Sequence, residues 1–291
     1  MKALIDGDVV TYQCGFASDQ VIYECPDGTE FQYKKEAIEY CNLNGQTIEA
    51  IEKHIEPEPV EHCLHSVKIF LNKILEEVDA DSHEILLTGP VQARKLVYPE
   101  YKANRDPTHK PFWYDKIHEY LVTTWNADLI AGSEADDAMA WKQWADPGTR
   151  AGDQFGAETC ICTIDKDLNM VPGFHYNWKA NAGAGDLYWV EETSANMCFF
   201  EQWLTGDSAD NIPGLKGWGP VKAQKYLKGL PSYDPKMLAR AVWAAWQKAP
   251  SPAEYNKAEW VNMIGDLLWM QRTPGETWDS FFGVPRFTSV S

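Results

Sequence analysis

Short apolar runs and longer stretches of helical period alternate along this chain. Four short runs have the composition of buried strands, and they cover residues 3–5, 84–88, 127–131 and 159–164. Helical period is expected over residues 34–80, most clearly over 62–78, then over 112–126, from 134, and again from 198 to about 271. Strands that alternate with helices form a parallel sheet with helices on both faces. The pattern therefore predicts an α/β fold with a mostly parallel sheet flanked by helices, followed by a helical region.

Two segments depart from this alternation. Residues 21–33 alternate in polarity on either side of Pro26-Asp27-Gly28, which predicts a β-hairpin. Residues 91–110 carry two prolines and little periodicity, so we expect a loop or arch there. We accordingly predict a core over residues 1–195, with an arch near 91–116, and a helical region over residues 196–291.

Composition bounds the class of protein. An apolar fraction of 44% with 13 Trp, 13 Tyr and 11 Phe is ample for a buried core. The chain shows no signal peptide and no apolar run of about 18 residues, so we expect no membrane span. Seven scattered cysteines favour reduced thiols in a cytosolic compartment over a disulfide framework.

The net charge of −17 argues at first against nucleic acid as a partner. Two short segments, which we call basic islands, are nevertheless rich in lysine and arginine. One, at residues 91–116, holds six basic residues against three acids, and the other, at 211–228, holds four lysines and no acid. A solvated surface would explain either island alone.

Acidic residues follow the ends of several predicted strands. They are Asp6 and Asp8, Glu134, Asp136 and Asp137, Asp165 and Asp167, and then Asp207 and Asp210. Because ligands bind beyond the carboxyl ends of the strands in such sheets, we expect these side chains to converge there. Converging carboxylates repel one another without cations, and hard oxygen ligands favour Mg²⁺ or Mn²⁺ over zinc. A carboxylate cage around two metal ions is a common solution for hydrolysing phosphodiesters.

Each of these features also has a plainer interpretation. Ser133–Asp136 fits a capping box at a helix start, and a single Asp after a strand is usually a turn residue. The His and Cys residues do not have zinc spacing, so we expect His62, Cys63, His65, Cys160 and Cys162 to be structural.

Residues 207–222 form the most specific stretch of the sequence. Gly214, Gly217 and Gly219 permit close turns, Pro220 suits a helix start, and lysines follow at one-turn spacing. Such a loop offers backbone amides and a helix N-terminus to phosphate, and it reads the backbone of DNA rather than its bases. A plain corner between two helices would explain the glycines but not the lysines.

These motifs together resemble the flap endonuclease family of structure-specific 5′ nucleases. Residues 132–137, 163–167 and 204–214 resemble that family's metal motifs in order and spacing, and the glycine stretch resembles its helix–three-turn–helix motif. Residues 98–105 resemble the start of its helical arch. Within the family, the compact size and Tyr101–Arg105 are most similar to the 5′→3′ exonucleases of short-tailed bacteriophages. The matches extend over about residues 3–228.

The resemblance implies a role for each matched residue. The tighter metal site would be formed by Asp6, Glu134, Asp136 and Asp165, with Asp8 as a neighbour. The second ion would be bound or positioned by Asp137, Asp167, Asp207 and Asp210. Lys102 would contact the scissile phosphate with support from Arg105, and Tyr101 would stack on a base. The DNA contacts would be Gly214, Lys216, Gly217, Gly219, Lys222 and Lys225, together with Arg94 and Lys95 of the first basic island.

The predicted function is therefore a Mg²⁺- or Mn²⁺-dependent 5′→3′ exonuclease with flap or RNA-primer removal, in phage DNA replication or recombination. The expected partners are duplex DNA with 5′ ends or flaps and RNA–DNA hybrids. We expect two divalent ions, a potassium ion at the glycine hairpin, and a monomer in the bacterial host cytoplasm.

One departure from the family pattern leaves alternatives open. The family usually has a further aspartate at the end of the second core strand, where this chain has Gly89. A DNA-end binding protein that has lost cleavage is therefore an alternative. A PIN-type ribonuclease is another, although that class usually lacks the glycine hairpin.

Overall fold

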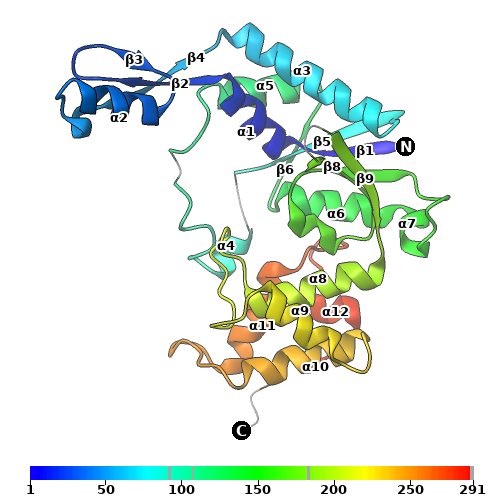
Figure 1. Ribbon diagram of the computed structural model, residues 1–291. Coiled ribbons are helices and arrows are strands. Elements are labelled where there is room, and N and C mark those ends of the chain that lie inside the picture. The colour runs from blue at the N-terminus through cyan, green and yellow to red at the C-terminus, as the bar shows by residue number, and fades with distance from the viewer. Residues whose placement is uncertain (91–92, 107, 182–183, 289–291) are drawn as a thin grey trace. The chain divides into compact units, whose positions relative to one another are not determined.

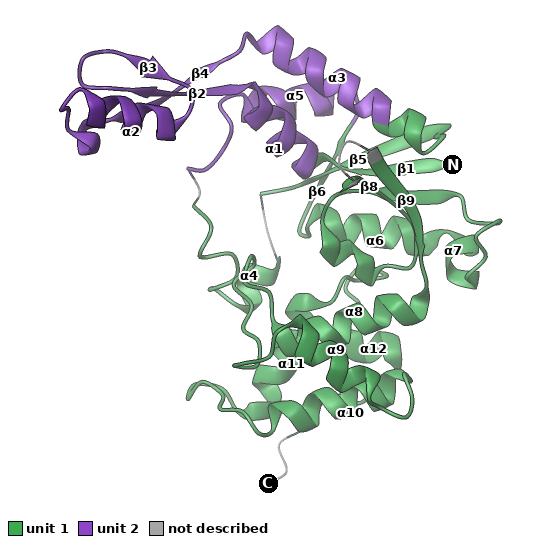
Figure 2. Cartoon of the chain, in the orientation of Figure 1, with its two compact units in different colours: residues 1–7, 74–106, 127–291 green, residues 8–73, 107–126 purple. Residues whose placement is uncertain are grey.

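The computed structural model describes residues 1–90, 93–106, 108–181 and 184–288, which form two compact units (Figure 2). The first unit comprises residues 1–7, 74–106 and 127–291, and the second comprises residues 8–73 and 107–126. The predicted division near residue 195 does not coincide with this boundary, because Met170 is buried in one cluster with the helical residues that follow 195. The predicted arch falls on both units, and its residues 91, 92 and 107 lie outside the described part of the chain.

The first unit is built on a six-stranded sheet in the order β6-β5-β1-β7-β8-β9. Figure 1 shows helix α6 (Ala135–Ala145) beside this sheet. All neighbouring strands are parallel except β8 and β9, which are antiparallel. The predicted fold class, a mostly parallel sheet flanked by helices, is confirmed. The strands are β1 (Lys2–Asp6), β5 (Ser82–Thr88), β6 (Asp128–Ile130), β7 (Thr159–Cys162), β8 (Gly173–Asn181) and β9 (Ala184–Val190).

The centre of this sheet is β1, which pairs with β5 on one side and β7 on the other. Ala3, Leu4 and Ile5 are completely buried, as their unbroken apolar run indicates. The hydrophobic pattern does not predict β8 and β9, because β9 is an edge strand whose side chains are mostly half-buried or exposed.

The helices of the first unit form an aromatic core at the C-terminal end of the chain. Trp203 and Trp278 are fully buried with ring centroids 4.6 Å apart, and Trp246, Trp260 and Trp269 belong to the same cluster. The tryptophans of the tail thus pack a core. The helices are α4 (Ala93–Val97), α6 (Ala135–Ala145), α7 (Pro147–Ala151), the 3₁₀ turn η2 (Lys166–Met170), α8 (Glu192–Thr205), α9 (Pro220–Lys228), α10 (Pro235–Trp246), α11 (Lys257–Leu268) and α12 (Trp278–Phe282). The short helix α4 lies in a segment for which the sequence predicts a loop.

The second unit contains a three-stranded sheet in the order β3-β2-β4. The hairpin predicted over residues 21–33 is confirmed by β2 and β3. The prediction of mostly helix over residues 34–80 is wrong at β4, which pairs along all of β2 although its sequence is too polar to look like a strand. The elements are α1 (Gly7–Ser18), β2 (Asp19–Glu24), β3 (Glu30–Phe31), α2 (Lys34–Leu43), η1 (Ile48–Ala50), β4 (Glu52–Pro57), α3 (Val60–Glu77) and α5 (Tyr114–Thr124), and α1 and α3 continue into the first unit.

No helix among the described residues is long and apolar enough to cross a membrane. Each of the seven cysteines is a free thiol.

Candidate active site

Asp6 stands at the carboxyl end of the central strand. Its side chain is only 2% exposed, and the hydroxyl of Thr163 donates to its Oδ2 at 2.8 Å. The same hydroxyl oxygen accepts from the backbone amide of Asp165 at 3.0 Å. Thr163 therefore ties the acid that follows β1 to the acid that follows β7, at the edge where parallel strands present their ligands.

Helix α6 brings the second pair of acids to this edge. Its N-cap residue is Glu134, whose side chain makes no capping bond, so the capping box starting at Ser133 is not formed. The amide of Ala135 instead donates to the hydroxyl of Thr88 at the end of β5, at 3.0 Å. Thr88 thus leaves the carboxylate of Glu134 available for other partners, a role that sequence reasoning missed.

The acids after β7 are positioned by a 3₁₀ turn. Asp165 is the N-cap of η2, and its Oδ1 accepts from the amide of Asp167 at 2.8 Å. This bond uses one carboxylate oxygen to fix the side chain.

The loop after α8 supplies the last pair of acids. Asp207 is 8% exposed, and its Oδ1 accepts from the amide of Ala209 at 2.8 Å. A bridge between Asp207 and Ile212 closes this tight loop and holds Asp210 on it.

Basic and phenolic groups from residues 98–105 reach into the acids. Nζ of Lys102 lies 2.5 Å from Glu134 Oε1 and 3.6 Å from Asp210 Oδ2. Arg105 pairs with Asp210 through its guanidinium and also donates to the carbonyl of Ala209. The candidate phosphate-binding cations thus lie beside the acids that are candidates for binding metal.

The base-stacking role of Tyr101 stays a prediction, and the contacts of this side chain do not support it. The side chain is 1% exposed, and its hydroxyl lies 2.8 Å from both Glu134 Oε2 and Asp210 Oδ2. Burial and the charge of Glu134 raise the pKa of Tyr101 far above its ordinary value. A buried, neutral phenol of this kind bridges two acids and has no free face for a base.

The role of Arg94 as a DNA contact also stays a prediction that its contacts do not support. Its side chain is only 10% exposed, and its two terminal nitrogens bind both oxygens of Asp137 at 2.7 and 2.8 Å. One of them also reaches Glu134 Oε2 at 2.9 Å. The carbonyls of Leu267 and Trp269 accept from the same guanidinium, so Arg94 fastens the C-terminal tail to the acids. Lys95 is exposed.

Asp137 therefore has a different environment from the other acids. Besides Arg94, its Oδ2 accepts from the hydroxyl of Ser133 at 2.8 Å. Its 2% exposure leaves it as the buried counter-ion of Arg94, and its predicted metal role is not supported by these contacts. Asp8 belongs to the second unit, so its contribution to the metal site stays a prediction.

Three of the acids carry the electrostatic signature of a cation site. Burial, followed by the charges of Asp6 and Asp165, raises the pKa of Asp136 well above its ordinary value. Desolvation, only partly offset by a backbone amide, raises the pKa of Asp165, and nearby Asp210 and Asp207 add to the effect. Desolvation together with Asp165 and Asp207 raises the pKa of Asp167 to about 7. Carboxylates that crowd one another in this way fit divalent cations with oxygen ligands.

The pKa of Glu134 is shifted in the opposite direction. Burial alone would raise its pKa, but the charges of Arg94 and Lys102 hold the pKa below its ordinary value. Among the described residues, no three of these acids have carboxylate oxygens that all lie within 4.8 Å of one another. In the described chain one group of possible metal ligands does meet this distance, and it consists of Glu24, Glu30 and His54 in the second unit.

The raised pKa values predict how stability responds to pH and to metal. Between about pH 4 and pH 7 the folded protein holds a proton on Asp167 that the unfolded chain has lost. We therefore expect the Tm of the metal-free protein to fall as pH rises through this window. Because divalent ions need deprotonated ligands, Mg²⁺ should raise the Tm more at pH 8 than at pH 5. Thermal scans at both pH values, with K⁺ at matched ionic strength as the control, would test this; equal shifts at both would contradict it.

Gly89 has a structural reason to lack a side chain. A Cβ there would lie 2.3 Å from the carbonyl oxygen of Ile130, which accepts from the amide of Gly89 at 3.0 Å. The chain after β5 therefore runs so close to the end of β6 that a side chain at position 89 would clash with the backbone of Ile130.

We expect Gly89→Asp to destabilise the protein by about 1–3 kcal/mol, the usual cost of overpacking. Urea unfolding would measure the loss. Gly229→Ala is a matched control, since its added Cβ would meet nothing closer than 3.4 Å. A Gly89→Asp protein of unchanged stability would show that the backbone at Ile130 yields easily.

The glycine hairpin is built by close backbone packing. A Cβ on Gly214 would lie 2.0 Å from the carbonyl oxygen of Thr205, and Gly217 has a positive φ of 77°. Gly219 is the N-cap of α9 with Pro220 at its first turn, as predicted. In the described chain the amides of Gly217 and Gly219 donate to no protein acceptor, and Lys216, Lys222 and Lys225 are exposed. This arrangement leaves these amides and the ammonium groups of Lys216 and Lys225 available to phosphates, while Nζ of Lys222 donates to the carbonyl of Gly217 at 3.3 Å.

No protein-family model matches this chain. It is 30% identical over 158 residues to an exonuclease of Escherichia phage T7, which covers 52% of this chain and 49% of the phage protein. It is 29% identical over 142 residues to the flap endonuclease Xni of a Shewanella species, which covers 46% and 52%. The thermostable DNA polymerase I of Thermus aquaticus is 30% identical over 183 residues, which covers 59% of this chain and 21% of the polymerase. The resemblance to structure-specific 5′ nucleases is confirmed.

The chain spans about half the length of the phage and flap endonuclease relatives that it matches. Two solved structures share its fold at low sequence identity. The 5′-exonuclease of bacteriophage T5 with bound zinc has a TM-score of 0.51 and 16% identity, and covers 84% of this chain and 89% of its own. The T5 flap endonuclease in a pseudo-enzyme-product complex with DNA and metal ions has a TM-score of 0.51 and 14% identity, and covers 92% and 98%.

Proposed function

We propose that this protein is a divalent-metal-dependent 5′ nuclease that hydrolyses phosphodiesters at the 5′ ends or flaps of duplex DNA. The observation that carries the proposal is the set of crowded carboxylates around Asp136, Asp165 and Asp167, with Lys102 beside them. The kinship with phage exonucleases and a flap endonuclease supports the same activity.

In this proposal the two parts of the site have separate tasks. The acids at the strand ends hold divalent cations, which supply Lewis-acid activation of water and stabilise the leaving oxygen. The exposed lysines and free amides of the glycine hairpin hold the duplex backbone, while Lys102 and Arg105 neutralise the phosphate at the acids. Magnesium and manganese suit these oxygen ligands best.

The direct test is an incubation of end-labelled duplex, flap and RNA–DNA substrates with Mg²⁺ or Mn²⁺. Release of 5′ nucleotides or of a flap is the expected result, and its size on each substrate assigns the preference. No release at any metal concentration would reject the nuclease.

Lys102→Ala should lower the rate strongly with a smaller change in DNA affinity. A charge at the transferring phosphate acts mainly in the transition state, so a fall of about 10²–10³-fold in kcat is expected. In the free protein Lys102 also neutralises Glu134, whose pKa should rise in the variant. Single-turnover cleavage and DNA binding in EDTA would separate the two effects. Equal losses in rate and affinity would instead make Lys102 a simple binding residue.

The second candidate is a DNA-end binding protein without cleavage, which Gly89 favours because it removes one carboxylate from the site. The crowded acids oppose it, since carboxylates facing DNA without cations would weaken binding. The incubation above decides between them.

A further inference from the structure

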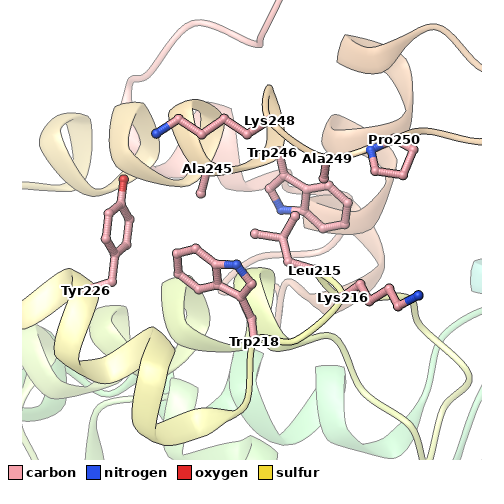
Figure 3. Close-up of a pocket in the computed structure, with 10 residues that line it drawn as sticks. Leu215, Lys216, Trp218, Tyr226, Ala245, Trp246, Lys248, Ala249 and Pro250 are labelled. Carbon is pink, nitrogen blue, oxygen red and sulfur yellow. The ribbon is translucent and has the colours of Figure 1, made fainter.

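An aromatic pocket lies between the glycine hairpin and the end of α10 (Figure 3). Its volume is about 360 Å³, at the lower end of the range of small-ligand pockets. Figure 3 shows Trp218 of the hairpin and Trp246 of α10 on opposite walls, with Leu215 between them and Tyr226 of α9 at one end. The pocket is therefore large enough for one flat ring and too small for a duplex.

The walls of this pocket are fixed by the surrounding structure. Nε1 of Trp246 donates to the carbonyl of Trp203 in the core at 3.0 Å, and the hydroxyl of Tyr226 donates to the carbonyl of Ala241 at 3.1 Å. The ammonium of Lys257 donates to the carbonyls of Trp246 and Ala249, which holds the turn after α10 in place. The rings thus keep their positions without help from a ligand.

Trp218 is held in the same way and stays partly exposed. Its ring packs edge-on against Tyr226 with centroids 5.1 Å apart, and Nζ of Lys222 lies 4.6 Å from its centroid. The ammonium group adds a positive charge beside the indole, which attracts nearby anions.

The charge of the lining is distinctive for so acidic a chain. Lys216 and Lys248 lie at opposite ends of the pocket, and none of the described residues that line it is acidic (Figure 3). The whole chain carries a net charge of −17. Aromatic walls with flanking ammonium groups are the combination by which proteins hold single-stranded nucleic acid, since the rings stack on bases and the cations meet phosphates.

We propose that this pocket binds one unpaired nucleotide of a DNA strand, with its base stacked on the partly exposed ring of Trp218 and its phosphates near Lys216 and Lys248. The inference rests on the proposed function in its choice of DNA, but the pocket contains none of the acids that would carry cleavage. It adds a site for single-stranded DNA to the duplex contacts of the hairpin.

The test measures binding of a labelled ten-nucleotide oligo(dT) by fluorescence anisotropy in EDTA, with the full chain. Ala249→Trp should block the pocket with a ring, and Lys248→Glu should repel the phosphate. Each is expected to weaken binding about tenfold, within the range for loss of one stacked base. Lys236→Glu is the matched control, because Lys236 is an exposed lysine at the start of α10, and this variant should bind nearly as the wild type does. Circular dichroism would confirm that each variant folds.

A second readout places the base. An oligonucleotide with a single 5-iodo-deoxyuridine should cross-link to Trp218 or Tyr226 on irradiation, and Ala249→Trp should remove that cross-link. Unchanged affinity in both folded variants, or cross-links confined to residues 98–105, would overturn the pocket assignment. Cleavage of a blunt duplex with Mg²⁺ should stay unchanged in Lys248→Glu. A wild-type chain that binds oligo(dT) through this pocket yet cleaves nothing would reject the nuclease and keep the pocket.

Discussion

Asp165→Asn is expected to abolish cleavage while leaving DNA binding and the fold intact. The asparagine keeps the side-chain oxygen that accepts from the amide of Asp167, so the turn at η2 survives. It removes only the negative charge, which in the native protein is crowded by Asp207 and Asp210. The rate should fall by at least about 10²–10³-fold, as when one electrostatic group of an active site is lost.

The same substitution should stabilise the metal-free protein near neutral pH. A carboxyl group whose pKa is raised by burial and like charges opposes folding once it ionises, and the neutral amide does not. A higher Tm in EDTA together with lost cleavage would separate a cation site from a structural one. Asp136→Asn should behave alike, since burial and the charges of Asp6 and Asp165 raise the pKa of Asp136 as well.

Single-turnover cleavage and thermal scans of both variants provide the measurement. Asp186→Asn, an exposed acid on the edge strand β9, is the matched control and should change neither quantity. Near-normal turnover in both Asp165→Asn and Asp136→Asn would mean that the acids have been assigned the wrong role.

The acids at strand ends could be predicted because their positions depend on local pattern alone. An apolar run that is followed by an acid predicts a buried strand, and it also predicts that the acid lies at the edge of the sheet where that strand ends. Asp6 after β1 and Asp165 after β7 illustrate this, since neighbouring parallel strands must end at the same edge. The glycine hairpin was predictable for the same reason, because its glycines mark backbone contacts that no side chain permits.

Side chains that act across the fold could not be predicted in this way. Arg94 and Tyr101 lie in a basic segment that looks like an exposed DNA contact, yet the partners that bury them are Asp137, Glu134 and Asp210, between 33 and 109 residues further along the chain. Burial is a property of those distant partners, so the local pattern carries no sign of it. The carbonyls of Leu267 and Trp269 are more remote still.

Edge strands escaped prediction for a related reason. Residues 52–57 form β4 because β2 offers six positions for pairing, and no property of the segment itself favours a strand. Strand β9 is also an edge strand, paired with β8, although its own residues 187–190 do favour a strand. Where one face is exposed and the residues are polar, pairing partners decide the conformation and intrinsic preference does not.

Arg94→Ala is expected to produce the largest loss of stability among single substitutions at the site. The native guanidinium binds both oxygens of Asp137, one oxygen of Glu134 and two backbone carbonyls. Removing it would leave the carboxylate of Asp137, which is 2% exposed, with a hydrogen bond from the hydroxyl of Ser133 at 2.8 Å. Breaking one side of a buried ion pair costs about 3–5 kcal/mol, and we expect a loss of that size here.

Urea unfolding followed by tryptophan fluorescence suits this measurement, because the buried tryptophans of the tail belong to the first unit. Lys95→Ala, at the exposed neighbouring position, should shift the free energy of unfolding by no more than about 0.5 kcal/mol. The double variant Arg94→Met with Asp137→Leu should recover part of the stability, since well-packed apolar residues replace a buried pair at little cost. Its cleavage should still be slower than that of the wild type, because Glu134 has lost one of the cations that hold its carboxylate. A single Arg94→Ala protein as stable as Lys95→Ala would instead mean that water replaces the guanidinium, and that the tail and the acids are fastened by other contacts.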